Sequence, residues 1–214
     1  MRGLIKSKII PTIFSLNKKE FDEKFKKIVP IASSIQIDFM DGFFVKKKSV
    51  HPRHIPNLSG FSNSFEAHLM VKDPVSYFDK IKDLGFKKVI VHIESFSCLC
   101  EIEDFFSFLK KQKIVPVLAL NPSTRLDDLI IEKFNFFLLM GVLPGAEGQK
   151  LRKSVFNKIS ILRGKKSGAK IQIDGGVNEK NASKLFKAGV DYLNSGSFIS
   201  ENDDPKGALR ALLK

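Results

Sequence analysis

Short apolar segments of strand type alternate with amphipathic segments along the whole chain of 214 residues. Several of the apolar segments are continuous runs of β-forming residues, which is the pattern of strands that are buried on both faces. The pattern predicts eight strands, over residues 8–14, 34–38, 64–71, 88–93, 115–120, 136–142, 170–175 and 191–196.

Most stretches between these strands carry the start and stop signals of helices. Segment 17–30 opens with an Asn that can cap a helix and spaces its apolar residues along one face. Segments 73–85 and 204–214 have Pro in the first turn, and segment 178–189 begins with Asn and ends with Gly. The connection 42–62 has no such pattern, so we expect a long loop with at most a short helix.

Eight strands with helical crossovers in about 200 residues indicate an α/β protein, a compact (β/α)₈ barrel of the TIM type. No linker of low complexity divides the chain, so we predict a single domain over residues 1–214. A doubly wound open sheet is the alternative fold. The G-x-G-x-x-G fingerprint of that fold is absent after the first strand, which favours the barrel.

Composition narrows the classes of protein. The 43% of hydrophobic residues argues against disorder, and no apolar run is long enough to cross a membrane. We expect a cytoplasmic protein, because the N-terminus lacks a secretory signal. The net charge is +13, but the lysines are spread along the chain, so we expect no specific nucleic acid and no membrane partner. Cys98 and Cys100 are expected to be reduced thiols.

Polar residues collect at the carboxyl ends of the predicted strands, where barrel enzymes have their active sites. Asp38 and Asp174 end strands on opposite sides of the barrel, so they can serve as general base and general acid on two faces of one carbon. His68 ends a third strand, and the three side chains offer ligands for Zn²⁺, Fe²⁺, Mn²⁺ or Co²⁺. The alternative is that the aspartates cap loops and His68 is a hydrogen-bonded core residue. Asp41 is interpreted as a carboxylate of the turn.

Two glycine-rich turns, "DGGV" at 174–177 and "SGS" at 195–197, follow the last two strands. The loops at these positions are the frequent phosphate site of such barrels, because glycine lets backbone N–H groups approach an anion closely. Met40, Met70 and Met140 fall at the ends of strands. They are interpreted either as core residues that fill gaps or as an apolar lining over a reactive intermediate.

The stretches "IDFMDG", "AHLMV", "LALNPST", "LLMGVLPGAEGQ", "IQIDGGVNEKN" and "AGVDYLNSGS" resemble the ribulose-phosphate 3-epimerase family, in order and over nearly the whole chain. The resemblance implies a homo-oligomeric barrel of the ribulose-phosphate-binding type that interconverts D-ribulose 5-phosphate and D-xylulose 5-phosphate in the pentose phosphate pathway. It implies proton transfer by two bases through an ene-diolate that a divalent metal ion stabilises.

Carried over by position, Asp38 and Asp174 are the acid–base pair, and Asp38, His68 and Asp174 hold the metal. The substrate contacts are Thr12, His68, Met40, Met70 and Met140. The phosphate contacts are Gly145, Ala146, Glu147, Gly148, Gly175, Gly176, Gly196 and Ser197.

Several positions depart from the family pattern. Gln36 stands where the family has a metal-binding histidine, two residues before Asp38, so the two side chains point to the same face of the strand. A glutamine oxygen favours Mg²⁺ or Mn²⁺ relative to Zn²⁺, which leaves the presence of metal open. Glu147 places a carboxylate in the phosphate loop. Gly141 replaces a threonine, and Phe43 replaces a histidine.

Two other functions remain open. An epimerase of another ketose phosphate, such as a ketohexose 6-phosphate, would keep the fold, with the 42–62 loop setting the substrate. A barrel without metal could instead bind a sugar phosphate and catalyse nothing.

Overall fold

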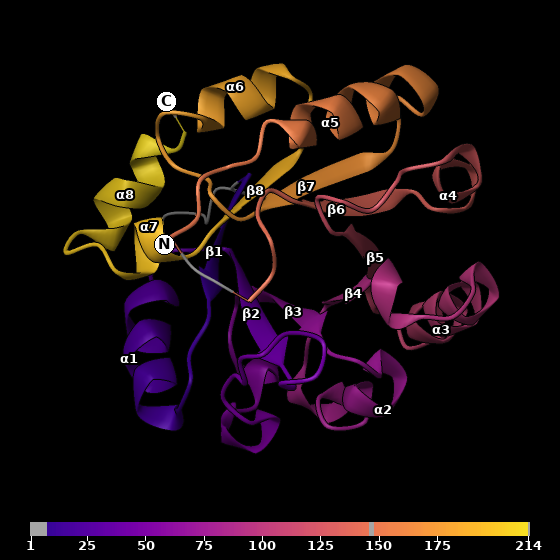
Figure 1. The fold of residues 1–214 in the computed structure, drawn as a ribbon. Helices are drawn as coiled ribbons and strands as arrows, with labels where there is room; N and C mark the ends of the chain where they lie inside the picture. Colours follow the sequence, from indigo (N-terminus) through magenta and orange to yellow (C-terminus); the bar gives the residue numbers. More distant parts are fainter. Residues whose placement is uncertain (1–7, 146–147, 214) are drawn as a thin grey trace.

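The structure is a computed structural model that describes residues 8–145 and 148–213. Its parallel strands pair in chain order, and the last pairs with the first, which closes a barrel with helices on the outside (Figure 1). The predicted (β/α)₈ barrel is therefore confirmed. The strands are β1 (Ile9–Ile13), β2 (Ser34–Met40), β3 (Ser64–Met70), β4 (Lys88–His92), β5 (Val115–Leu120), β6 (Phe136–Met140), β7 (Lys170–Asp174) and β8 (Tyr192–Ser195).

Successive side chains of each strand point alternately into the barrel and out toward the helices. In β6, Leu138 and Met140 belong to a cluster inside the barrel, while Phe137 and Leu139 belong to the larger core between strands and helices. Both faces of β6 are thus apolar, which explains why this strand reads as a continuous hydrophobic run.

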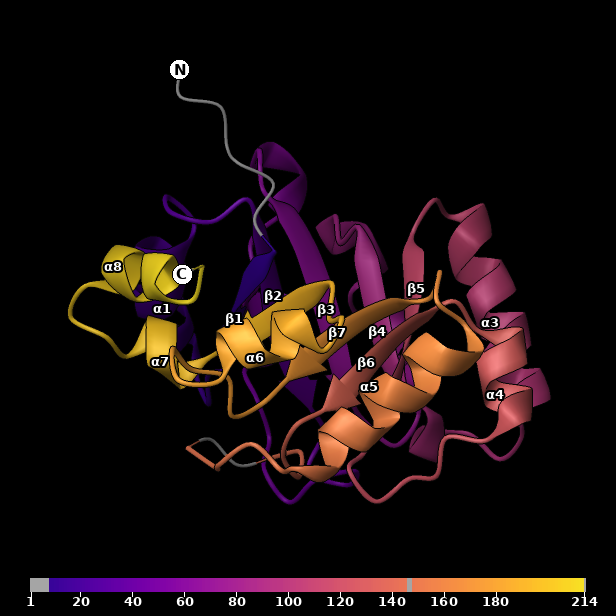
Figure 2. The same ribbon diagram turned by 90° about the horizontal axis from the view of Figure 1, so that it is seen from above.

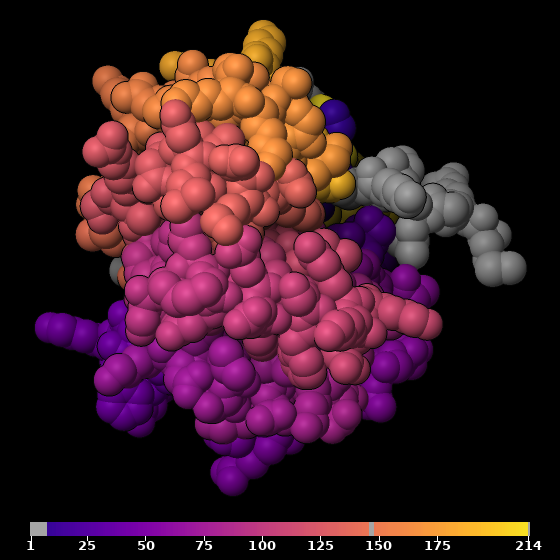
Figure 3. Space-filling model, turned by 90° about the vertical axis from the view of Figure 1, so that its right-hand side faces the viewer, coloured from indigo at the N-terminus to yellow at the C-terminus, as the bar shows by residue number. Residues whose placement is uncertain are grey.

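Helices surround the barrel, with α3 and α4 on one side and α1, α7 and α8 on the other (Figure 2). Seen from the side, successive parts of the chain form successive bands across the surface (Figure 3). Within residues 8–145 and 148–213, no helix has the length and apolar character that crossing a membrane requires. The helices are α1 (Lys18–Ile28), α2 (Pro74–Phe78), α3 (Leu99–Lys111), α4 (Asp128–Lys133), α5 (Ser154–Lys165), α6 (Ala182–Lys187), α7 (Ser197–Ser200) and α8 (Pro205–Ala211).

Two of the predicted helices are shorter than their sequence signals suggest. The helix predicted over 73–85 ends at Phe78, and a 3₁₀ turn, Lys82–Leu84, leads to Gly85 in the left-handed conformation at φ 93°. The helix predicted over 178–189 begins only at Ala182. Asn178 starts a turn instead, because its side chain accepts the backbone N–H of Lys180.

The connection 42–62 is a long loop, as predicted, with two 3₁₀ turns at Pro52–His54 and Leu58–Gly60. Asp41 fixes where this loop begins. One of its carboxylate oxygens accepts the backbone N–H groups of Phe43 and Phe44, and the other accepts that of Lys72 after β3. These bonds hold the pKa of Asp41 below its usual value despite its partial burial, so this carboxylate has a structural role in the turn.

The cysteines differ from the expectation of reduced thiols. Cys98 and Cys100 are joined in a disulfide, with their Cα atoms 5.3 Å apart. Cys98 is the extended N-cap residue of α3, and Cys100 lies in the first turn of that helix. This change from extended to helical backbone brings the two side chains together, which the spacing alone does not reveal.

A polar layer closes the end of the barrel where the strands begin. Glu66 and Gln172 are buried there, and Lys88 reaches both from the start of β4. The Lys88 ammonium donates to a Glu66 oxygen at 2.5 Å and to Gln172 Oε1 at 3.3 Å, and Gln172 Nε2 donates to Glu66 at 2.9 Å. The charges of Lys88 and Glu66 are paired, and both polar ends of the Gln172 amide have hydrogen-bond partners. These polar groups can therefore be buried without leaving a charge or a donor unpaired.

Candidate active site

The strand register brings the predicted acid–base residues to one end of the barrel. Asp38 in β2 lies beside His68 in β3, and Met140 in β6 lies beside Asp174 in β7. Asp38 and His68 lie two residues before the ends of their strands, Met140 and Asp174 are the last residues of theirs, and His68 contacts both aspartates, so these residues form a layer near the carboxyl ends of the strands. This is the end at which barrel enzymes have their active sites.

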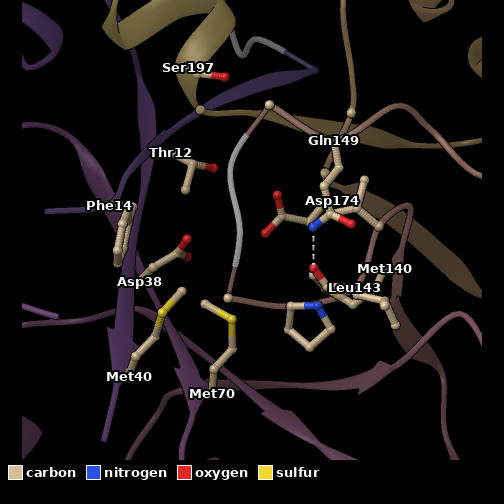
Figure 4. A pocket seen from close by; sticks show the side chains of 17 residues that line it. Thr12, Phe14, Asp38, Met40, Met70, Met140, Leu143, Gln149, Asp174 and Ser197 are labelled. Atoms are coloured by element: carbon tan, nitrogen blue, oxygen red, sulfur yellow. Dashed lines mark hydrogen bonds between the residues drawn. The ribbon is translucent and has the colours of Figure 1, made fainter. Parts of the chain in front are cut away.

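A pocket opens over this layer, and its two carboxylates approach from different sides (Figure 4). Gln36 and His68 do not line it, because both are fully buried beneath its floor. Ala146 and Glu147 lie outside the described residues. The predicted site residues that line the pocket are Thr12, Asp38, Met40, Met70, Met140, Gly145, Gly148, Asp174, Gly175, Gly176, Gly196 and Ser197.

Asp38 and Asp174 are largely desolvated but keep access to the pocket, since 11% of each side chain is exposed. Burial raises the pKa of Asp38, and the nearby negative charge of Asp174 adds to this shift, while bonds from His68 and Gln36 oppose it. The pKa of Asp38 therefore lies above its usual value.

His68 lies between the two aspartates from below. Its Nδ1 is 3.2 Å from Asp38 Oδ1 and 3.3 Å from Asp174 Oδ2. Burial by itself lowers the pKa of His68, but hydrogen bonds and charge from Asp174 and Asp38 outweigh it and raise this pKa to about 9. In this arrangement His68 carries a positive charge beneath the two carboxylates.

A chain of side chains continues from His68 to the edge of the barrel. His68 Nε2 lies 2.9 Å from His92 Nε2, and His92 Nδ1 lies 3.2 Å from Glu94 Oε2. Bonds from His92, Thr124 and Asn121 hold the pKa of Glu94 below its usual value although burial raises it. When the ionised Glu94 accepts His92 Nδ1–H, the other ring nitrogen of His92, Nε2, has a free lone pair and accepts a hydrogen bond from His68 Nε2–H.

Gln36 lies at the centre of the buried group, on the interior face that it shares with Asp38. Its amide nitrogen donates to Asp38 Oδ1 at 2.8 Å and to Asp174 Oδ2 at 2.7 Å, and lies 3.3 Å from His68 Nδ1. Its amide oxygen accepts Asn194 Nδ2–H at 2.6 Å. Both polar ends of the side chain are held by protein groups.

Asp38, His68 and Asp174 form a cluster that could hold a metal ion, with one ligand atom from each within 4.8 Å of the others. The Gln36 amide nitrogen contacts the same three residues, and it presents N–H groups where a cation requires a lone pair. With the amide in this orientation, the residues present do not fit a divalent ion.

The side of the pocket opposite the glycine turns is apolar. Met40 and Met70 pack with Phe14 in a small cluster that Phe44 and Val45 cover. The sequence pattern did not single out Phe14, which follows β1 and reads as an ordinary strand residue. Phe14 lies two residues after Thr12, so strand alternation places both side chains on the same face. This spacing is the signal that could have identified it.

The glycine turn after β7 needs residues without side chains. Gly175 and Gly176 have φ of 97° and 72°, in the left-handed region that favours glycine. A Cβ atom at Gly176 would lie 2.5 Å from the Leu151 nitrogen. Gly141, which departs from the family pattern, is also required: a Cβ there would clash with the Gly175 carbonyl and lie 2.5 Å from Leu151 Cδ1. The departure from threonine thus fits the packing of this chain.

Solved structures of other proteins share this architecture. 3-Hexulose-6-phosphate synthase from Salmonella typhimurium matches with a TM-score of 0.69 and 17% identity, over 96% of each chain. KGPDC from Streptococcus mutans matches with a TM-score of 0.69 and 12% identity, over 96% of this chain and 94% of that one. At such identities the likeness shows the fold.

Sequence relatives identify the family. Ribulose-phosphate 3-epimerase from Helicobacter pylori is 28% identical over 96% of this chain and 96% of its own length. The enzyme of the same name from Bacillus subtilis is 29% identical over 94% of this chain and 96% of its own length. The model of the ribulose-phosphate 3 epimerase family matches residues 8–200. With the barrel and its paired carboxylates, this match shows that the chain is an isomerase of the ribulose-phosphate 3-epimerase family.

Proposed function

We propose that the protein interconverts D-ribulose 5-phosphate and D-xylulose 5-phosphate by proton transfer at C3. The observation that carries this proposal is the pair Asp38 and Asp174, which reach one pocket from opposite sides of the barrel. Family membership supports a pentose-phosphate epimerase as the activity.

The proposed reaction needs two groups on opposite faces of one carbon. One aspartate removes the proton from C3, the electrons of the C3–H bond move toward the C2 carbonyl oxygen, and an ene-diolate forms. The other aspartate, in its protonated form, returns a proton to C3 from the far side and inverts the centre. The raised pKa of Asp38 suits it to carry that proton in one direction, with the roles exchanged in the other.

The walls of the pocket suit this intermediate. We propose that Met40, Met70 and Met140 lie against the ene-diolate and keep water away from C3, which prevents loss of the proton to solvent. Thr12 lines the same wall and can contact a substrate hydroxyl through its Oγ1.

The glycine turns on the other side of the pocket are the proposed phosphate site. Backbone N–H groups at Gly175, Gly176, Gly196 and Ser197 would bind the phosphate oxygens, and Gly145 and Gly148 line the same pocket. Gln149 Nε2 donates to the Leu143 carbonyl at 2.7 Å, which fixes the position of Gln149 beside this part of the pocket (Figure 4).

The test is an epimerase assay with D-ribulose 5-phosphate in which D-xylulose 5-phosphate is measured directly, alongside a ketohexose 6-phosphate as the competing substrate. We expect turnover of the pentose phosphate, with incorporation of solvent deuterium at C3 of the product. Preference for the hexose phosphate would reassign the substrate. Binding of both sugars without turnover of either would show a non-catalytic barrel.

A further inference from the structure

The two carboxylates beneath the pocket are bridged by a neutral side chain. Gln36 Nε2 has two N–H groups, one directed to Asp38 Oδ1 at 2.8 Å and one to Asp174 Oδ2 at 2.7 Å. Gln36 has no exposed surface, so water does not compete for these bonds. The amide nitrogen therefore makes the contacts to both aspartates that a shared cation would make.

An ion and this amide cannot occupy the same place between Asp38 Oδ1 and Asp174 Oδ2. The amide nitrogen has no lone pair to offer a cation, and its N–H dipoles point their positive ends toward the place from which both carboxylates would coordinate one. For Gln36 to become a ligand, its oxygen would have to take the place of its nitrogen.

Asn194 opposes that rotation. Its Nδ2–H donates to Gln36 Oε1 at 2.6 Å, and Asn194 is itself fully buried. If Gln36 turned over alone, its oxygen would face two carboxylate oxygens and its NH₂ group would face the NH₂ group of Asn194. Both amides would have to turn together, within a packed interior.

We propose that the Gln36 carboxamide, oriented by Asn194, replaces a divalent ion between Asp38 and Asp174, so that the protein works without a resident metal. Gln36 is a positioning residue: it holds the two carboxylates beneath the pocket against their mutual repulsion. This inference rests on the epimerase activity proposed above.

The first experiment needs no variant. The protein, purified without added metal, is analysed for bound elements and assayed with and without a chelator, and is then titrated with Zn²⁺, Mn²⁺, Co²⁺ and Mg²⁺ by calorimetry. We expect far less than one ion per chain, unchanged turnover in chelator and no saturable binding of one ion. A stoichiometric ion whose removal abolishes turnover would overturn the inference and leave the epimerase function intact. A protein without metal and without turnover would instead overturn the function.

Three variants separate replacement of the ion from simple packing. Gln36→His restores an imidazole at the position, and we expect it to bind about one divalent ion per chain. The matched control is Gln172→His, a change at another fully buried barrel glutamine whose amide bonds to Lys88 and Glu66 rather than to the aspartates, and it should bind none. Gln36→Met keeps the volume but removes both N–H donors. It should lower kcat by about 10- to 100-fold, with KM little changed, because the amide lies below the pocket. Wild-type kcat in Gln36→Met would contradict the positioning role.

Discussion

Asp174→Asn tests the two-base mechanism because it removes the proton-transferring group with little change in shape. The Asn carbonyl oxygen can still accept Gln36 Nε2–H, which is 2.7 Å from Asp174 Oδ2 in the native protein. A charge-assisted hydrogen bond becomes a neutral one, so we expect a loss of about 1 kcal/mol in the free energy of unfolding and an intact barrel.

The effect on catalysis should be much larger. A positioned acid–base group contributes about 10²- to 10⁴-fold, so kcat should fall by that factor, equivalent to about 3–5 kcal/mol in the barrier. KM should change little, because the proposed phosphate contacts come from backbone groups. A control is Asp191→Asn, which weakens the ion pair with Arg163 near the start of β8 and should lower stability but not kcat.

The decisive assay follows hydrogen at C3. Each epimer is incubated separately with the variant in D₂O, and both interconversion and deuterium uptake are measured by NMR. Neither epimer should be converted into the other, while the epimer whose C3–H faces Asp38 should still exchange its C3 proton with solvent. Equal exchange of both epimers, or interconversion within about tenfold of wild type, would refute the assignment of Asp174 as one of two bases.

Three further experiments test the packing and charge described above. Gly141→Thr should lower the free energy of unfolding by about 1–3 kcal/mol in denaturant titrations, whereas Gly164→Ala, with open space around it in α5, should raise it by up to about 1 kcal/mol. Lys88→Met should cost about 3–5 kcal/mol by leaving Glu66 buried and unpaired, and adding Glu66→Leu should recover much of this loss. The pKa of His68 in the folded protein is about 9, above its usual 6.5. The stability that His68 contributes is therefore complete below pH 6.5 and is lost as the pH rises through 9. The fall in Tm over this pH range should be smaller in His68→Asn.

The sequence predicts most of the barrel because the information is local. Apolar runs mark the strands, and the strand ends carry Asp38 and Asp174 into one pocket. Local patterns also predict the same face for Gln36 and Asp38, since strand alternation fixes it. The disulfide at Cys98 and Cys100 depends on the backbone at the start of α3, which composition does not specify.

The depth of the site was harder to predict. In the sequence His68 lies near the end of a strand, yet in the structure it is fully buried below the pocket. Strand alternation predicts the direction in which a side chain points, but it does not predict which other side chains cover it. The partner of Gln36 is Asn194, which is 158 residues away and becomes a neighbour only when the barrel closes. Such contacts between distant strands decide what the glutamine can do.

The polar layer of Glu66, Lys88 and Gln172 has a kinetic consequence. This layer and the buried amides above it fill the interior, so the strands that the structure describes leave no passage from the pocket to the far end of the barrel. Each product molecule must leave through the opening by which the next substrate enters. A bound epimer would fill both the pocket and this entrance, so each epimer should act as a competitive inhibitor of the conversion of the other.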